Sequence, residues 1–190
     1  MHFKARISEL RTMQDLYFIA IIPPADVAQP LDNLRHELSR KFNSSHALNS
    51  PPHITLVPPF KMKREQLARL EEALKKSAKR HHPFSLKVND FGHFGQHTLF
   101  AKVNLQDKLR LLQQDVHGAV KDELSLQIDR LEREYHPHLT LAFKDLKKSQ
   151  FSPAWQYLQQ KELKLHFEAC NIVLLRHSGK RWLIDKEIPL

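Results

Sequence analysis

Two copies of one short motif carry the residues best suited to chemistry in this sequence. Residues 52–56 read PHITL and residues 137–141 read PHLTL, so both copies follow the pattern Pro-His-apolar-Thr-apolar. The chain has only four threonines, and two of them lie in these motifs, so chance is a poor explanation for the repetition. The simpler alternative is two buried strands that each carry a tolerated histidine.

Each motif divides into two faces if it forms a β-strand, because successive side chains on a strand point to opposite sides. His53 and Thr55 share one face of the first copy, and His138 and Thr140 share one face of the second. The apolar residues between them form the other face and can anchor the strand in a core. Each copy thus presents one imidazole and one hydroxyl on the same side.

Two imidazoles and two hydroxyls suit the cleavage of a phosphodiester. Near neutral pH one imidazole can accept a proton while the other donates one, and such acid–base help contributes about 10²–10⁴ in rate. Threonine hydroxyls can donate hydrogen bonds to non-bridging phosphate oxygens. This set needs no metal or other cofactor. A nucleoside 2′,3′-cyclic phosphate is a natural substrate, because water loses a proton as the departing ribose oxygen gains one.

The composition favours one globular domain or two small lobes with an anionic partner. The 190 residues are 41% hydrophobic, and 30 Lys and Arg against 21 Asp and Glu give a net charge of +9, which favours RNA. Four glycines exclude a phosphate-binding glycine loop or a dinucleotide fold. We expect no membrane span, no secretory signal and, from the single Cys170, a cytoplasmic protein. We also expect a monomer.

Hydrophobic periodicity predicts the order strand, helix, motif strand, helix, strand twice. The first repeat has these elements at 16–22, 26–42, 53–57, 63–79 and 84–91, with Pro58-Pro59 ending the motif strand. The second has them at 98–103, 105–124, 138–143, 153–161 and 164–175, and a final strand follows at 182–188. The repeats predict two lobes, at about 16–91 and 98–175, paired about a pseudo-two-fold axis with both motifs in a central cleft.

The doubled motif at this spacing resembles the paired His-x-Thr/Ser-x motifs of the two-histidine (2H) phosphoesterase superfamily. Within that superfamily the chain looks like the LigT-type 2′-5′ RNA ligase family, whose members are also called RNA 2′,3′-cyclic phosphodiesterases. The resemblance extends from about residue 14 to residue 190 and includes the opening strand before Pro23-Pro24. It implies an α+β, bilobal LigT-like fold, with two antiparallel-rich sheets flanked by helices around a central cleft.

The resemblance also implies a cyclic phosphodiesterase that needs no metal. Such an enzyme opens the 2′,3′-cyclic phosphate ends of RNA or nucleotides to 2′-phosphomonoesters. The carry-over makes His53, Thr55, His138 and Thr140 the catalytic residues, with His138 as the base on water and His53 as the acid on the 3′-oxygen. Ligase activity would be the same chemistry in reverse, and we expect it to be minor because water is abundant.

Four further residues are candidates for substrate binding. Many members of the family carry Arg shortly after the second motif, where this chain has Phe143-Lys144. Lys144 can supply the charge but not a bidentate grip. Phe60, Phe94 and Tyr135 could stack on a base, although most aromatic side chains belong to the core.

Other functions stay open from the sequence. His81, His82 and His93 have no cysteine or paired carboxylate near them, so we expect a surface loop and no metal site. The motif reads only a phosphate, so a related phosphodiesterase could instead act on 2′-5′ oligoadenylate or on a small cyclic phosphate. A non-catalytic, basic RNA-binding module is the other alternative, and intact His and Thr in both copies argue against it.

Overall fold

The computed structural model describes residues 14–124 and 134–190; the N-terminal segment, in which we expect no secretory signal, lies largely outside these ranges. The strands are β1 (Gln14–Ile21), β2 (Ile54–Lys63), β3 (Phe84–Phe94), β4 (Thr98–Val103), β5 (His138–Ala142), β6 (Lys164–Ala169), β7 (Asn171–His177) and β8 (Trp182–Pro189). The helices are α2 (Ala25–Phe42), η1 (His46–Asn49), η2 (Arg64–Gln66), α3 (Leu67–Ala78), α4 (Asp107–Leu124) and α5 (Lys148–Gln159). The predicted α+β class is confirmed.

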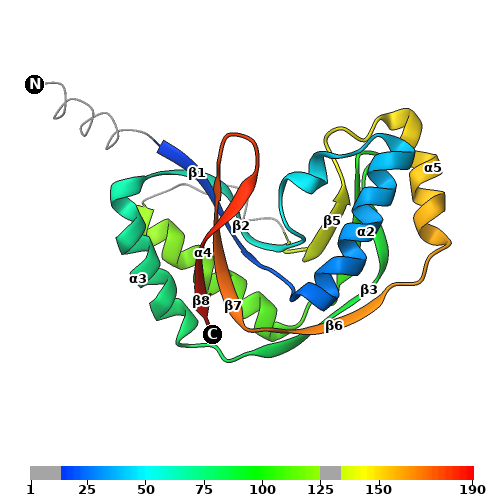
Figure 1. Cartoon of the computed structure of the whole chain (residues 1–190). Helices are drawn as coiled ribbons and strands as arrows, with labels where there is room; N and C mark the ends of the chain where they lie inside the picture. Colours follow the sequence, from blue (N-terminus) through cyan, green and yellow to red (C-terminus); the bar gives the residue numbers. More distant parts are fainter. Residues whose placement is uncertain (1–13, 125–133) are drawn as a thin grey trace, which may run out of the picture.

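The strands form one curled antiparallel sheet in the order β6-β3-β4-β5-β2-β1-β7-β8 (Figure 1). The two motif strands, β2 and β5, lie side by side at its centre and pair at a single position, Ile54 with Leu139. The expected bilobal arrangement with central motif strands is therefore present, and the two expected sheets are two halves of one sheet. The two halves are joined only where the motif strands β2 and β5 pair.

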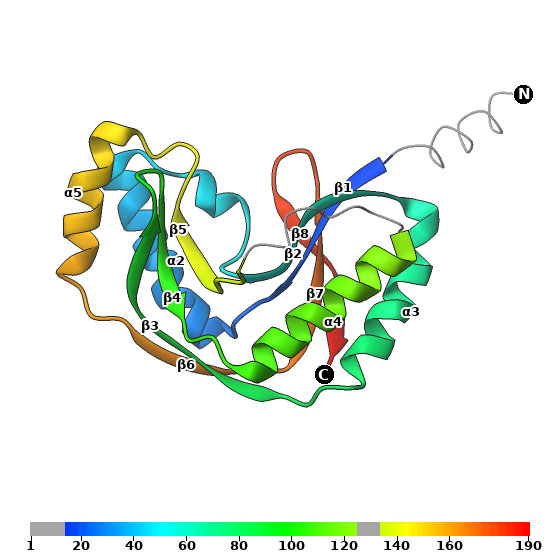
Figure 2. The ribbon, with the colours of Figure 1, turned by 180° about the vertical axis from the view of Figure 1, so that it is seen from behind.

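The helices cover the two halves of the sheet in pairs (Figures 1 and 2). Helices α2 and α5 lie against the half that contains β5 and β6, whereas α3 and α4 pack against each other and against β2 and β8. The buried residues of α2 include Val27, Leu31, Leu34 and Leu38, at the spacing that predicted an amphipathic helix. Each half is thus a layer of helices on a layer of strands.

The lobes do not coincide with the sequence repeats, which corrects the predicted boundaries of 16–91 and 98–175. Strand β3, which closes the first repeat, pairs with β4 and β6 of the second repeat. The physical reason is the three-residue turn between Phe94 and Thr98, where Gly95 has φ +53° and folds β3 back onto β4 as a hairpin. Hydrophobic periodicity shows that a strand exists but does not select its partner.

The motif strand β2 runs through Pro58-Pro59, where the sequence predicted it to end. Val57 pairs with Ile19 and Phe60 pairs with Tyr17, so the two prolines lie opposite one residue of β1. This register shift is a bulge, in which a residue without a backbone N–H does not remove a ladder hydrogen bond. The strand therefore continues to Lys63 with an altered twist.

Two other boundaries differ from the prediction. Helix α5 begins at Lys148, five residues before the predicted start at 153, and contains Pro153 in its interior. The strand predicted over 164–175 divides at Cys170, because β6 pairs with β3 in one half of the sheet and β7 pairs with β1 in the other.

None of the helices in the described ranges is long and apolar enough to cross a membrane.

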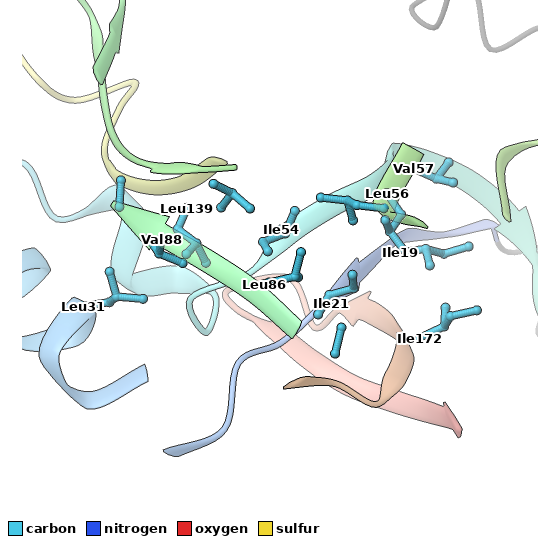
Figure 3. Packing of buried hydrophobic residues seen from close by; sticks show 14 of the residues in the cluster. Ile19, Ile21, Leu31, Ile54, Leu56, Val57, Leu86, Val88, Leu139 and Ile172 are labelled. Atoms are coloured by element: carbon cyan, nitrogen blue, oxygen red, sulfur yellow. The ribbon is translucent and has the colours of Figure 1, made fainter. Parts of the chain in front are cut away.

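The main core lies between the sheet and the helices, and the apolar residues of both motifs are part of it. Ile54 and Leu139 are 0% and 1% exposed, and Figure 3 shows them among Leu86, Val88 and Leu31. Burial of a side chain of this size contributes about 1.5–3 kcal/mol. The core thus fixes the side of each motif strand that faces inward, and with it the side left for chemistry.

Strand β1 is buried on both faces. Tyr17, Ile19 and Ile21 belong to the main core, whereas Phe18 and Ala20 belong to a smaller cluster that Trp182 packs against. This explains why residues 16–22 read as a continuous apolar run rather than an alternating one. The smaller cluster lies on the face that carries the motif histidines, as the contact between Phe18 and His53 shows.

Candidate active site

The four motif side chains converge because Ile54 and Leu139 are partners in an antiparallel ladder. By this register His53 lies across from Thr140, and Thr55 lies across from His138. All four point away from the core that holds Ile54 and Leu139. The histidines occupy one diagonal, and diagonal neighbours of this kind have Cα atoms about 7–8 Å apart. The predicted convergence of the two motifs is therefore what the strand pairing produces.

Each motif histidine makes the same hydrogen bond to the backbone two residues before it. His53 Nδ1 lies 2.8 Å from the carbonyl oxygen of Pro51, and His138 Nδ1 lies 2.7 Å from that of His136. A carbonyl oxygen only accepts hydrogen bonds, so Nδ1 carries the proton in both neutral rings. Nε2 is then the unprotonated nitrogen, and the backbone has fixed which atom of each ring can accept a proton.

Burial lowers the pKa of both imidazoles below the usual value of 6.5. The pKa of His53 falls to about 4, chiefly through burial, with the charges of Arg35 and His138 adding to the effect and the Pro51 hydrogen bond opposing it. The pKa of His138 is also lowered, again chiefly through burial. Both rings are therefore mainly neutral at pH 7.

His53, Thr55 and Thr140 line one pocket of about 350 Å³. His138 lies beside this pocket, with its ring centroid 5.0 Å from that of Phe94 and 5.1 Å from that of Phe100. Phe94 is 36% exposed and stacks on Phe100 at 4.4 Å. Of the aromatic residues proposed for base stacking, Phe94 therefore lies next to a motif histidine.

The other two aromatic candidates have structural positions. Phe60 is 7% exposed and belongs to the main core. Tyr135 packs against the same core, and its hydroxyl donates a hydrogen bond of 3.1 Å to the carbonyl oxygen of Thr55. Burial raises the pKa of the Tyr135 hydroxyl well above its usual value, so the group stays protonated. Tyr135 thus supports the first motif strand from behind.

A buried arginine at the pocket was missed by the sequence prediction. Arg35 of α2 is 2% exposed and lines the pocket together with His53. Its Nη1 lies 2.8 Å from an oxygen of Asp32, and its Nη2 donates to the carbonyl oxygen of Ser50 at 2.6 Å. Its Nε is buried without a hydrogen-bond partner among the described residues. A fixed cation therefore faces the same volume as the motif hydroxyls.

Lys144 and His46 also line the pocket. Lys144 was predicted to bind substrate and does line the pocket, and its backbone adopts the left-handed conformation at φ +60°. A non-glycine residue in this region is uncommon and is often found at functional sites. His46, which the sequence prediction did not include, also lines the pocket. Its ring lies edge-on to Phe143, with the centroids 4.9 Å apart.

Asp145 connects the chain segments that carry His46 and Lys144. Its carboxylate accepts hydrogen bonds of 2.8 Å from the hydroxyl of Ser44 and from the backbone N–H groups of Ser45 and His46. These bonds connect the start of η1 to the turn that follows β5, across about a hundred residues. The hydrogen bonds lower the pKa of Asp145 despite its partial burial, so the carboxylate is ionised at neutral pH.

An aromatic wall faces His53. The ring centroids of Phe18 and His53 are 4.7 Å apart, and those of Phe18 and Trp182 are 4.5 Å apart. His177 supports Trp182 from the other side at 4.9 Å. Phe18 and Trp182 both line the pocket. The described residues contain no cluster of three or more His, Cys, Asp or Glu side chains that could hold a metal ion.

Comparison with known proteins identifies the family of the chain. The family model of the 2′-5′ RNA ligase superfamily matches residues 23–181. The chain belongs to the 2′-5′ RNA ligase superfamily. This match spans both motifs and confirms the two-histidine phosphoesterase resemblance drawn from them.

Relatives within the superfamily carry the name "Putative phosphoesterase". One from Geobacillus kaustophilus is 28% identical over 154 residues, covering 80% of this chain and 81% of its own. Another, from Bacillus cytotoxicus, is 32% identical over 130 residues, covering 66% of this chain and 68% of its own.

Solved structures share the fold at low sequence identity. Escherichia coli LigT, solved with 3′-AMP, has a TM-score of 0.65 at 18% identity, covering 94% of this chain and 99% of its own. TT0787 of Thermus thermophilus has a TM-score of 0.66 at 18% identity, covering 94% and 98%. These likenesses confirm the LigT-like fold.

Proposed function

We propose that this protein is a phosphodiesterase that hydrolyses the 2′,3′-cyclic phosphate of RNA or nucleotide ends to a 2′-phosphomonoester, without a metal. The observation that carries the proposal is the hydrogen bonding of both motif histidines, which leaves Nε2 of each ring free on the face shared with Thr55 and Thr140. A nucleotide substrate is in keeping with the 3′-AMP complex of the similarly folded LigT.

The reaction requires one proton acceptor and one proton donor. A neutral imidazole accepts a proton from water through Nε2 as the water oxygen forms a bond to phosphorus. The bond between phosphorus and the ribose 3′-oxygen breaks, and the protonated second imidazole gives its proton to that oxygen. The phosphate remains on the 2′-oxygen, and the two rings have exchanged protonation states. Each proton transfer of this type contributes about 10²–10⁴ in rate.

The electrostatics of the free protein favour His53 as the base, which reverses the assignment implied by the family resemblance. With a pKa of about 4, His53 is neutral at pH 7, the form that accepts a proton. The pKa of His138 is lowered chiefly through burial, with the charge of His136 adding to the effect and the His136 backbone hydrogen bond opposing it; Arg35, which acts on His53, is not among the causes. Because the Arg35 charge disfavours protonation of His53 and is not among the causes at His138, we assign the proton of a singly protonated site to His138, which then serves as the acid.

The hydroxyls and cations of the pocket bind the phosphate in this proposal. Thr55 and Thr140 donate hydrogen bonds to the two non-bridging oxygens, where negative charge builds up as water attacks. Arg35 and Lys144 approach the same volume from α2 and from the turn after β5. Arg35 is paired with Asp32, so Lys144, which forms no ion pair among the described residues, supplies the positive charge that offsets the phosphate charge, in a pocket partly shielded from water where electrostatic interactions are strong.

The proposal is tested with a short RNA that ends in a 2′,3′-cyclic phosphate, incubated in EDTA. The native protein is expected to form the 2′-phosphomonoester. His53→Asn and His138→Asn should each lower the rate of its formation at least about 100-fold. His97→Asn, in the turn before β4, is the matched control and should retain full activity.

Four results would contradict the proposal in whole or in part. Full activity in either motif variant would remove the histidine mechanism, and loss of activity in EDTA would remove its independence of metal. Turnover of 2′-5′ oligoadenylate or of a small cyclic phosphate, but not of the RNA end, would reassign the substrate within the same chemistry. Efficient net joining of 2′,3′-cyclic and 5′-hydroxyl ends would make the ligase direction the main one.

A further inference from the structure

The active-site pocket continues into a second groove on the surface. The groove has a volume of about 380 Å³ and shares Ser50 and Trp182 with the pocket. One wall comes from α2 and the end of η1, with His36, Leu48 and Asn49, and the other comes from the β7–β8 hairpin. In Figure 1 this hairpin projects from the sheet beside the segment that contains η1. The two volumes therefore form one path that leads outward from the motif residues.

The hairpin presents a cation and apolar surface to this groove. Arg181, Trp182 and Leu183 line it in succession, and Leu183 is 49% exposed. Arg181 is held at the turn, where its backbone N–H donates to the Ser178 hydroxyl at 3.1 Å. The Trp182 ring is fixed between Phe18 and His177. A fixed aromatic edge next to an apolar side chain and an arginine is the combination that binds bases and phosphates of single-stranded nucleic acid.

The single acidic group in the groove lining has its charge compensated. Asp32 lies 2.8 Å from the guanidinium of the buried Arg35. The remaining charged or titratable lining residues are His36 and Arg181. The groove therefore does not repel a phosphate, and the chain as a whole carries a net charge of +9.

The size of the pocket limits how much of an RNA substrate it can hold. The pocket of about 350 Å³ is at the small end of the range for ligand sites, which is about 300–1,000 Å³. It accommodates one nucleotide beside the catalytic residues. The cyclic phosphate occupies the 2′ and 3′ oxygens of that nucleotide, so a longer RNA continues only from its 5′ carbon. The adjoining groove is the next volume along the path.

We propose that this groove binds the nucleotide that precedes the cyclic phosphate end of a single-stranded RNA. Its base lies against Leu183 and the edge of Trp182, and the connecting phosphate lies at Arg181. The proposal rests on the proposed function and makes it more specific, because it identifies the substrate as an RNA strand rather than a free cyclic nucleotide.

The test compares adenosine 2′,3′-cyclic phosphate with the dinucleotide ApA that ends in the same cyclic phosphate. Base stacking contributes enough binding to make kcat/KM about 10- to 100-fold higher for the dinucleotide. Arg181→Ala and Leu183→Ser are expected to lower this ratio about 10-fold without changing kcat/KM for the mononucleotide. Trp182 is left intact, because it also lines the catalytic pocket.

Two matched variants control for surface charge and apolar area. Arg110 and Leu111 are exposed residues of the same types on the outer face of α4, and Arg110→Ala and Leu111→Ser should leave the ratio unchanged. Lys144→Ala is expected to lower kcat/KM for both substrates by the same factor, because Lys144 lines the catalytic pocket itself.

The outcomes separate this inference from the function on which it rests. Equal kcat/KM for the two substrates, or a ratio unaffected by both hairpin variants, would overturn the inference while hydrolysis of the mononucleotide upholds the function. An equal loss on both substrates in the hairpin variants would also overturn it. If neither substrate is hydrolysed, the proposed function fails and the inference fails with it.

Discussion

The guanidinium Nη2 of Arg35 donates a 2.6 Å hydrogen bond to the carbonyl oxygen of Ser50. Ser50 is followed by Pro51, whose own carbonyl oxygen accepts the hydrogen bond from His53 Nδ1. Arg35 thus holds the segment that orients the first motif histidine, and its charge also helps to lower the pKa of that ring. Helix α2 is in this way connected to the chemistry of β2.

Arg35→Met is therefore expected to raise the pKa of His53 and to shift the acid limb of the kcat/KM profile to higher pH. Arg35→Lys keeps the charge but loses the planar fork that reaches Asp32 and Ser50 together. It should lose activity about 10-fold with a smaller shift of the acid limb. The measurement is kcat/KM from pH 3.5 to 8 for the native protein and both variants. An unchanged acid limb in Arg35→Met would show that the Arg35 charge does not lower the pKa of His53.

The roles of the two histidines can be distinguished with the leaving group. A phosphodiester of 4-nitrophenol needs no acid, because nitrophenolate leaves without a proton. His138→Ala should lose about 10²–10⁴ on a cyclic phosphate and much less on bis(4-nitrophenyl) phosphate, whereas His53→Ala should lose activity on both. The opposite pattern would restore His138 as the base.

Thr55→Val and Thr140→Val remove the hydroxyl with little change of shape. Each is expected to lower kcat about 10²–10³, because a donor to the developing negative charge is lost. Thr→Ser at either position keeps the hydroxyl and should stay within about 10-fold of the native rate. Equal losses in the Val and Ser variants would indicate that packing, rather than hydrogen bonding, is responsible.

The pH dependence of kcat/KM should be bell-shaped, with both limbs below about pH 6.5. The base must be neutral, which places the acid limb near the His53 pKa of about 4. The acid must be protonated, and the pKa of His138 is lowered from 6.5, which places the alkaline limb below that value. A bound anionic phosphate favours the charged rings, so both limbs should lie at higher pH in the kcat profile. A pH-independent kcat/KM between 4 and 8 would contradict coupled histidine catalysis.

Stability should also depend on the protonation of His53. Its folded pKa of about 4 lies below the unfolded value of 6.5, so between these values the unfolded chain binds more protons. Stability therefore falls as the pH falls through this window. Between pH 7 and pH 5 this group accounts for a loss of about 2 kcal/mol, which His53→Asn should abolish. Urea unfolding of both proteins at the two pH values measures the difference.

The sequence was sufficient for the fold class and for the common face of the four motif side chains, because alternation in each motif determines which side chains share a face. It was insufficient for Arg35. A charged residue usually faces solvent, yet Arg35 lies on the buried stripe of α2 between Leu34 and Leu38. A charge within an apolar stripe was the available signal. The other missed residues, His46 and Trp182, reach the pocket only through the turns that bring η1 and the β7–β8 hairpin together.

The sequence also did not determine which strands pair with each other. Strand β3 has the alternation of a half-buried strand in either half of the sheet, so its place beside β4 depends on the turn at Gly95. Phe60 and Tyr135 illustrate the same limit at the level of single residues. Both lie close in sequence to a motif, but their side chains face the core.

The crossing of strands between the two halves has a consequence for folding. Ala20 of β1 pairs with Val173 of β7, near the other end of the chain, and neither half of the sheet can be completed from one repeat alone. Contacts between such distant segments are slow to form, because a long loop must close first. The pairing of Ile54 with Leu139, which creates the site, depends on both halves. Enzymatic activity is therefore acquired only with the completed topology, and no folding intermediate built from a single repeat can carry it.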